Sequence, residues 1–138
     1  MDRLFEFVGN HYILVSVFVL LLLGFIYNES RRGGKSVTAQ ELVTLMNQDK
    51  AVILDVREPG EYRTGHMRNA LNVPVAALRE RIGELEKFKS RPVVVACKMG
   101  ASSSGAGTML RKAGFERVFK LRGGITEWRS LNFPLVKG

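Results

Sequence analysis

The 138-residue chain contains a single cysteine, four prolines and one tryptophan. One cysteine cannot build an internal disulfide framework, and an unpaired thiol is typical of a reducing compartment. No Cys/His cluster has the spacing of metal ligands, and the sequence contains no internal repeat. No G-x-G-x-x-G dinucleotide fingerprint follows a predicted strand either. We therefore expect no metal and no other cofactor.

Basic residues outnumber acidic residues by 21 to 13, so the formal net charge is +8. The part of the chain after Lys35 still has 17 basic and 10 acidic residues. Such a balance favours an anionic substrate, an anionic membrane surface or nucleic acid. Because no Arg/Lys-rich run with interleaved aromatic residues occurs, we expect no nucleic-acid partner.

A long apolar run near the N-terminus, residues 12–27 (YILVSVFVLLLLGFIY), contains no charged side chain. Extended back to Phe7, the run has 21 residues, enough for about 30 Å of helix, which matches a bilayer core. A cleaved signal peptide would need a positive segment before the run and a small-residue cleavage site, whereas only Arg3 precedes it. We predict a transmembrane helix at 12–27, with a start at Phe7 as the longer alternative.

The charges on either side of this run predict its orientation. Arg31, Arg32 and Lys35 follow the run, whereas Arg3 alone precedes it. The positive-inside rule places the more basic flank in the cytoplasm. We expect a single-pass protein of the inner (cytoplasmic) membrane, with residues 1–11 on the outer side and the rest of the soluble part in the cytoplasm.

Residues 28–36 are predicted to form a polar linker, and residues 37–138 a single domain. In this domain short apolar runs alternate with segments of helical spacing. Each predicted strand is almost continuously apolar, which is typical of a parallel sheet covered on both faces. We therefore predict an α/β domain of three layers, with a central, mainly parallel sheet between helices. The predicted strands are 51–56, 71–73, 92–96 and 118–121, and the predicted helices are 38–46, 61–63, 75–88, 103–113 and a short one after Gly124.

The most strongly predicted strand, 92–96, leads directly into Cys97 and then into a loop before a predicted helix. Catalytic groups of open α/β sheets lie beyond the carboxyl ends of strands. Gly100 permits a tight turn, and successive N–H groups of such a loop can form an anion nest that the helix N-terminus reinforces. We expect this nest to stabilise a Cys97 thiolate, the alternative being a buried structural cysteine. The candidate loop consists of Lys98, Met99, Gly100, Ala101, Ser102 and Ser103.

Other candidate residues have structural explanations. Asp55 and Arg57 flank a strand end, where an ion pair or hydrogen bonds that hold the turn are the expected role. His66 lies in a loop and no sequence feature pairs it with Cys97, so we expect a structural histidine. Lys98, by contrast, is expected to attract an anion at the rim of the loop. The remaining candidates are Met99 at a pocket entrance or on an apolar surface, Gly123 at a backbone turn and Trp128 in the core.

Six sequence elements together resemble the rhodanese family over residues 37–134. The resemblance extends to the apolar N-terminus, which is similar to that of membrane-anchored single-domain rhodanese-like proteins of bacteria. It implies the rhodanese-like fold for the predicted three-layer domain. The six elements are Leu54–Arg57, Glu61–Tyr62, Gly65–Met67, Ala70–Pro74, Cys97–Ser103, and Gly123–Gly124 with Trp128.

The resemblance implies a two-step sulfur transfer. A small anionic sulfane-sulfur donor such as thiosulfate passes sulfur to Cys97, and the persulfide then delivers it to cyanide or a thiol acceptor. Lys98–Ser103 would enclose that sulfur, whereas Asp55, Arg57 and His66 match signature positions of structural role. The lipid bilayer is the expected partner of residues 12–27, and a membrane protein is a candidate partner for the sulfur.

One departure from the family pattern concerns Ser102, which stands where many family members have Arg. The loop therefore lacks a bidentate anion donor. This leaves open a second interpretation, a membrane-localised module of rhodanese-like fold that binds proteins and has little or no turnover. The same residue argues against the related dual-specificity phosphatases, whose phosphate-binding loop ends in an Arg that clamps the phosphoryl group.

Overall fold

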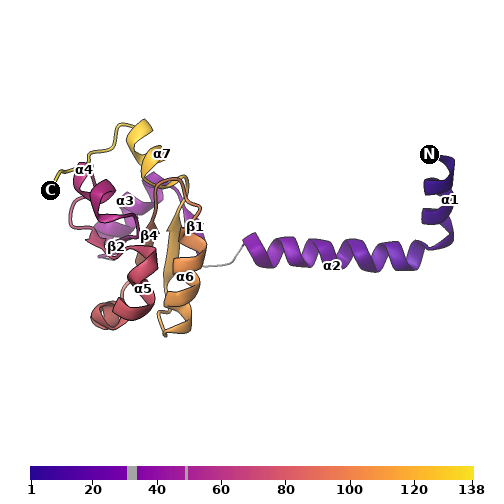
Figure 1. Cartoon of the computed structure of the whole chain (residues 1–138), viewed down its shortest axis with the longest axis horizontal. Coiled ribbons are helices and arrows are strands. Elements are labelled where there is room, and N and C mark those ends of the chain that lie inside the picture. The colour runs from indigo at the N-terminus through magenta and orange to yellow at the C-terminus, as the bar shows by residue number, and fades with distance from the viewer. Residues whose placement is uncertain (31–33, 49) are drawn as a thin grey trace. The chain divides into compact units, whose positions relative to one another are not determined.

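The computed structural model describes residues 1–30, 34–48 and 50–138. The chain divides into two compact units, residues 1–31 and residues 32–138. The described residues of the first unit form two helices, and the second unit contains a five-stranded sheet with helices (Figure 1).

The N-terminal unit consists of α1 (Asp2–Asn10) and α2 (Tyr12–Ser30), which meet at a bend of 90° (Figure 1). Among the described residues, no helix is by itself long and apolar enough to cross a membrane, whereas the bent pair passes that test by length and composition only. The predicted segment 12–27 is helical throughout. A continuous helix from Phe7 is wrong, because the chain leaves the helical conformation at His11.

Part of the predicted linker, 28–36, has regular secondary structure. Helix α2 extends to Ser30, and strand β1 (Lys35–Val37) begins before the predicted end of the linker. The β1 sequence, KSV, has no continuous apolar pattern, so the sequence does not indicate a strand there. Arg31 and Arg32, on which the predicted orientation depends, lie outside the described residues.

The second unit is built around a parallel sheet with the strand order β1-β5-β4-β2-β3. Strands β2 (Val52–Asp55), β4 (Val93–Ala96) and β5 (Val118–Leu121) are central, and β3 (Leu71–Asn72) and β1 are the edges. Every residue of β2 and β4 is buried, and all except Asp55 are apolar, as expected for central strands between two layers. The predicted α/β architecture with a parallel sheet is confirmed.

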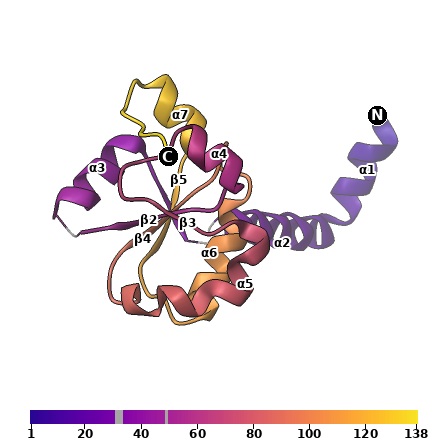
Figure 2. The same cartoon turned by 60° about the vertical axis from the view of Figure 1, so that its left-hand side comes forward.

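Helices cover both faces of this sheet, with α3 and α7 on one side and α5 and α6 on the other (Figure 2). Successive residues of a strand point to opposite faces, so Val95 packs with Leu110 in one buried cluster and Val94 packs with Leu42 in the other. The two clusters together hold the three layers. The helices of this unit are α3 (Ala39–Gln48), α4 (Pro59–Thr64), α5 (Val75–Arg81), the 3-10 helix η1 (Ile82–Phe88), α6 (Ser103–Lys112) and α7 (Gly124–Ser130).

The helical segment predicted at 75–88 is present but changes type within its length. The α-helix α5 ends at Arg81, and η1 continues the chain as a 3-10 helix. Gly83, a weak helix former, lies at this change. The buried face is nevertheless as expected, since Leu78 and Leu85 are both buried in the same cluster.

Candidate active site

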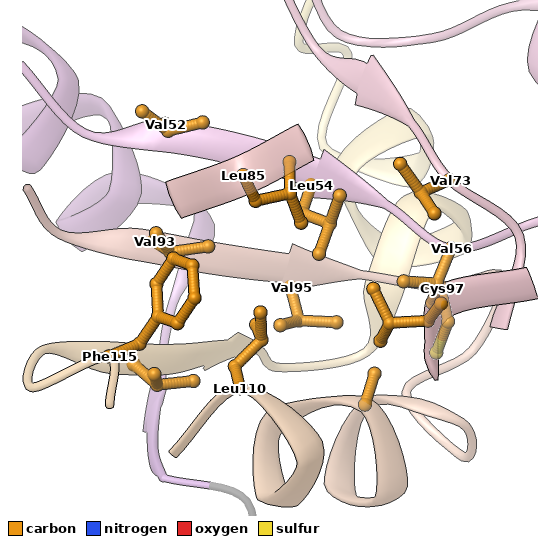
Figure 3. Close-up of a cluster of buried hydrophobic side chains, with 13 residues drawn as sticks. Val52, Leu54, Val56, Val73, Leu85, Val93, Val95, Cys97, Leu110 and Phe115 are labelled. Carbon is orange, nitrogen blue, oxygen red and sulfur yellow. The ribbon is translucent and has the colours of Figure 1, made fainter. Parts of the chain in front are cut away.

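Cys97 directly follows β4, at the carboxyl end of the middle strand of the sheet. Its exposed fraction is 4%. Figure 3 shows it at one end of a buried apolar cluster, beside Val56, whereas Val93 and Phe115 lie at the other end. Because burial of this degree suits both a structural and a functional cysteine, the polar contacts of the sulfur decide between them.

Two hydrogen-bond donors converge on the sulfur of Cys97. The backbone N–H of Gly100 donates to Sγ over 2.7 Å, and the hydroxyl of Ser103 donates to Sγ over 3.3 Å. Both donors belong to the loop that the sequence singles out. Donors aimed at sulfur favour its anionic form, and the thiolate is the nucleophilic form of cysteine. The surroundings of Cys97 are therefore suited to hold a negative charge on sulfur.

The loop reverses its direction at Gly100. This glycine has a φ of +97°, in the left-handed region that residues with a side chain rarely adopt. The turn brings the Gly100 N–H back to the sulfur of Cys97, three residues earlier. The structure thus has the tight turn that the sequence predicts here, and the turn supplies one of the two donors.

The first amides of α7 hold the beginning of the loop. The Ile125 N–H donates to the Cys97 carbonyl over 2.8 Å, and the Thr126 N–H donates to the Lys98 carbonyl over 2.9 Å. In a trans peptide the C=O and N–H groups point in opposite directions. With these two carbonyl groups directed to α7, the N–H groups of Lys98 and Met99 point away from it. The contacts with α7 therefore help to orient the loop amides.

Two glycines allow α7 to approach the loop this closely. Gly123 and Gly124 have φ values of +73° and +61°, and Gly123 is the N-cap of α7. A Cβ atom on Gly124 would overlap the carbonyl oxygens of Cys97 and Lys98. The sequence places Gly123 at a turn but gives no sign of Ile125 and Thr126, because every residue except proline has a backbone N–H.

The outer part of the loop faces solvent. Lys98, Met99, Ala101 and Ser102 are exposed, Met99 with an exposed fraction of 68%. Ser102 is the N-cap of α6 but makes no side-chain capping bond, and the helix begins at Ser103. The first N–H groups of a helix lack intrahelical partners and carry partial positive charge. The sulfur thus lies between the buried apolar cluster and the N-terminus of α6, which is suited to bind anions.

Lys120 is a further cation on the α6 side of the sheet. It lies in β5 opposite Val95 of β4, and its exposed fraction is 9%. Its Nζ atom donates to Ser104 Oγ, in the first turn of α6, over 3.4 Å. A lysine within the otherwise apolar strand VFKL is the sequence signal that could have identified it. Lys120 places a buried positive charge beside the helix that follows the loop.

Asp55, the last residue of β2, and Arg57 form a buried ion pair at the end of this strand. The Arg57 guanidinium donates to both carboxylate oxygens of Asp55, the shortest distance being 2.7 Å, and to the Gly65 carbonyl at 2.7 Å. The Asn72 amide donates to the backbone carbonyl groups of both residues. These bonds satisfy the two charges within the turn, so the structure gives the pair a turn-holding position.

His66 packs on the ring of Tyr62, with the ring centroids 3.7 Å apart. Its Nδ1 atom lies 2.8 Å from the Tyr62 carbonyl oxygen, and its backbone pairs with Val136 near the C-terminus. Among the described residues these are the polar partners of His66, and Cys97 is not one of them. In the same part of the chain, no three or more His, Cys, Asp or Glu side chains are grouped as metal ligands.

Trp128 belongs to the core of the α3–α7 face, with an exposed fraction of 4%. Its ring stacks on Phe133 at a centroid distance of 4.6 Å, and its Nε1–H donates to the Pro134 carbonyl over 3.0 Å. These contacts hold residues 133–134, which follow α7, against the core of the domain. Trp128 thus supports the helix whose first amides hold the loop.

Comparisons of the sequence and of the structure with known proteins agree with each other. Residues 38–131 match the family model of the rhodanese-like domain. The chain is 34% identical over 142 residues to the uncharacterized protein YibN of Escherichia coli (strain K12), covering 100% of this chain and 99% of YibN. It is 30% identical over 96 residues to the thiosulfate sulfurtransferase GlpE of Pseudoalteromonas translucida (strain TAC 125), covering 70% and 90% of the two chains. The crystal structure of a rhodanese-related protein from Thermoplasma volcanium superposes with a TM-score of 0.67 at 31% identity, covering 74% and 97%.

Proposed function

Because this chain belongs to the rhodanese-like domain family, we propose that it is a sulfurtransferase in which Cys97 carries the transferred sulfur as a persulfide. The observation that supports this most directly is the convergence of the Gly100 N–H and the Ser103 hydroxyl on Sγ. A purely structural cysteine in an apolar core has no need of such donors. The similarity to a thiosulfate sulfurtransferase makes thiosulfate the donor that we propose.

The proposed reaction has two steps. In the first, the Cys97 thiolate attacks the outer sulfur of thiosulfate, the Sγ–S bond forms, and sulfite leaves with the electron pair of the broken S–S bond. The new terminal sulfur then carries the negative charge. In the second, cyanide or a thiolate attacks that terminal sulfur, the Sγ–S bond breaks, and the Cys97 thiolate is regenerated. Electrons balance within each step, so neither step calls for a redox cofactor.

Several features of the loop suit these steps. The Gly100 N–H and the Ser103 hydroxyl stabilise the thiolate that attacks and that later leaves, and the N-terminus of α6 adds partial positive charge. Lys98 is exposed at the rim, where it attracts an anionic donor. Because only 4% of Cys97 is exposed, its surroundings favour a small donor over a bulky one.

We also propose that residues 12–27 cross the inner (cytoplasmic) membrane once, with the rhodanese-like domain in the cytoplasm and a membrane protein as one acceptor. Helix α2 exposes apolar side chains such as Phe18 and Leu21, at 64% and 69%, which suits lipid better than water. In intact spheroplasts, external protease should leave the domain uncut. Cleavage of the domain in intact spheroplasts would contradict the cytoplasmic location. Release of the protein from membranes by alkaline washing would contradict the membrane span.

A second candidate function is a membrane-localised interaction module with little or no sulfur transfer. The exposed Ser102, at the position where many family members have Arg, is the observation that favours it. Under this alternative, Cys97→Ser should fully complement a deletion strain, whereas removal of residues 12–27 should abolish function. Loss of function in Cys97→Ser with normal protein levels would instead support the sulfurtransferase.

Mass spectrometry of the full chain after treatment with thiosulfate tests the sulfurtransferase proposal. We expect the mass of one added sulfur atom on the wild type and none on Cys97→Ala. Ser130→Ala serves as a matched control, because the Ser130 hydroxyl donates to the Glu127 carbonyl at the far end of α7. This control should load like the wild type. An equal sulfur load on wild type and Cys97→Ala would rule out Cys97 as the carrier.

A further inference from the structure

Helix α1 exposes an apolar face that no residue of the chain covers in the part that the structure describes. Leu4, Phe5 and Val8 have exposed fractions of 61%, 71% and 40%, and α1 contains no buried residue. Successive helical residues are rotated by about 100°, which separates apolar from polar side chains into arcs of about 160° and 100°. The apolar arc holds Leu4, Phe5, Phe7 and Val8, and the polar arc holds Asp2, Arg3, Glu6 and Asn10.

Such a helix needs a surface to lie on. With nine residues, α1 is shorter than the ~12–15 residues at which isolated helices become even marginally stable in water. Its stability must therefore come from burial of the apolar arc. The covering surface has to be apolar on one side and aqueous on the other, because Asp2 and Glu6 lie on the opposite face.

The bilayer core does not meet this requirement, whereas the bilayer surface does. Asp2, Arg3 and Glu6 are charged side chains, which are costly to place in the hydrocarbon core of a membrane. Residues 12–27 of α2, by contrast, contain no charged side chain. A helix with one apolar and one charged face lies in the interface, with its apolar face buried about 5–10 Å at the boundary of headgroups and acyl chains.

The bend between α1 and α2 has the geometry that this position requires. The two helices meet at 90° (Figure 1), so α1 runs parallel to the membrane plane when α2 runs across it. The His11 N–H donates to the Phe7 carbonyl over 3.0 Å, and the two rings stack at 4.6 Å. Tyr12, next to the bend, is of a residue type enriched at membrane–water interfaces.

We propose that α1 is an interfacial helix whose face of Leu4, Phe5 and Val8 lies in the membrane surface on the side where α2 begins. The inference rests on the proposed function only in taking α2 as a membrane span. The polar face carries Asp2 and Glu6 against Arg3 alone, so it has no excess of positive charge that would call for anionic lipid, and zwitterionic lipid suffices as the partner. The anchor is then L-shaped, and α1 fixes the depth of α2.

Spin labelling of the full chain in phosphatidylcholine vesicles tests this proposal. Cys97→Ser removes the native thiol, so one nitroxide can be placed at a time by Leu4→Cys, Val8→Cys, Glu6→Cys or Leu20→Cys. Power saturation with oxygen and with a water-soluble nickel chelate reports the depth of each label. We expect Leu4 and Val8 labels at one shallow depth, about 5–10 Å below the headgroups, the Glu6 label in water and the Leu20 label deep.

The alternatives give different patterns. A depth that increases steadily from Leu4 through Val8 to Leu20 would mean one tilted span and would overturn the inference. Equal nickel access at Leu4 and Glu6 would place α1 in water, and protection of Leu4 from both reagents would place it against protein; either result also overturns it. A water-exposed Leu20 label would overturn the membrane span itself, whereas a deep Leu20 label with any of the other patterns leaves the span intact.

Discussion

At the scale of single residues, the sulfur of Cys97 is held between two donors while much of its surroundings is apolar. Apolar surroundings strengthen each contact with a charged sulfur, because little water is present to screen it. The same surroundings raise the free energy of a thiolate that has no hydrogen-bond partner. Only proline would remove the Gly100 N–H, and its fixed negative φ is incompatible with the φ of +97° at this position, so Ser103 is the donor that mutagenesis can test.

Ser103→Ala should slow sulfite release from thiosulfate by about tenfold or more. A hydrogen bond to a charged group contributes about 1.5–3 kcal/mol, and 1.4 kcal/mol corresponds to a factor of ten. With saturating cyanide as the acceptor, each turnover forms one thiocyanate for each sulfite released, so the rate can be followed as thiocyanate. Ser130→Ala, which loses a serine hydroxyl remote from the sulfur, should keep the wild-type rate. An unchanged rate in Ser103→Ala would show that its hydroxyl does not support the reactive sulfur.

Tyr62 gives the domain a pH-dependent contribution to stability. Partial burial and, secondly, the charge of Asp55 raise the pKa of Tyr62 above its ordinary value, against the opposing effect of Arg57. The neutral phenol is also the form that donates to the Ala70 carbonyl over 2.6 Å. A raised pKa in the folded state means that this contribution is complete below about pH 10, the unfolded value, and is lost as the pH rises further.

Tyr62→Phe should therefore lower the free energy of unfolding by about 0.5–1.5 kcal/mol, as expected for one lost hydrogen bond. Urea unfolding at a series of pH values measures the difference between wild type and variant. We expect a constant difference between pH 7 and 9 and a smaller one above pH 10. Lysine titration affects both proteins alike and cancels in the difference. A difference in free energy of unfolding that grows above pH 10 would contradict a raised pKa of Tyr62 in the folded protein.

Among single residues, the sequence predicts side-chain chemistry better than backbone chemistry. Cys97, Gly100 and Ser103 are recognisable because a cysteine, a glycine and small residues follow the best strand. The amides of Ile125 and Thr126 are not recognisable, since an N–H group has no residue type of its own. Their part in the site depends on how α7 approaches the loop, which only the fold determines.

At the scale of elements, α7 acts as a support for the loop after β4. The amides of its second and third residues, Ile125 and Thr126, bind loop carbonyl groups. Its approach depends on Gly124, which lies against the same carbonyl oxygens. The loop is therefore held by a helix from the other face of the sheet as well as by α6. A change at Gly124 should affect the loop although this residue does not contact the sulfur.

Gly124→Ala should destabilise the domain and reduce sulfur loading of Cys97. Its Cβ would overlap two carbonyl oxygens, and its φ of +61° costs a residue with a side chain about 1–2 kcal/mol in addition. Gly105→Ala, in α6, is the matched control: its Cβ meets no atom within 4 Å, so we expect about 0.5–1 kcal/mol of stabilisation. Urea unfolding and mass spectrometry after thiosulfate treatment measure both effects. Equal behaviour of the two variants would contradict a supporting role of α7.

Elements with a strong apolar pattern could be predicted from the sequence. The strands β2, β4 and β5 coincide closely with predicted strands, since buried central strands are almost continuously apolar. The edge strand β1 could not be predicted, because Lys35 and Ser36 give it a polar start and its pairing with β5 is distant in sequence. The strand order likewise follows from tertiary packing and has no local signal.

At the scale of the whole molecule, β1 joins the start of the domain to its last strand. Val37 is 3% exposed, and its carbonyl accepts a bond from the Arg122 N–H over 2.8 Å. A chain that begins at Lys35 should keep the wild-type stability of the domain, whereas one that begins at Thr38 should lose about 1.5–3 kcal/mol, the contribution of one buried Val. Both keep the Thr38 cap of α3. Equal urea midpoints for the two chains would show that β1 is dispensable.

The strand order has a consequence for how the protein is made. β1 leaves the ribosome soon after the apolar N-terminal segment, but its partner, β5, ends at Leu121. The sheet therefore closes only when almost the whole chain has been synthesised, and the nascent domain stays open, with unpaired strands, until then. If the N-terminus is already inserted in a bilayer, this waiting period passes at the membrane surface, where β2 and β4 can pair with each other but the edge of β4 that later binds β5 stays unpaired.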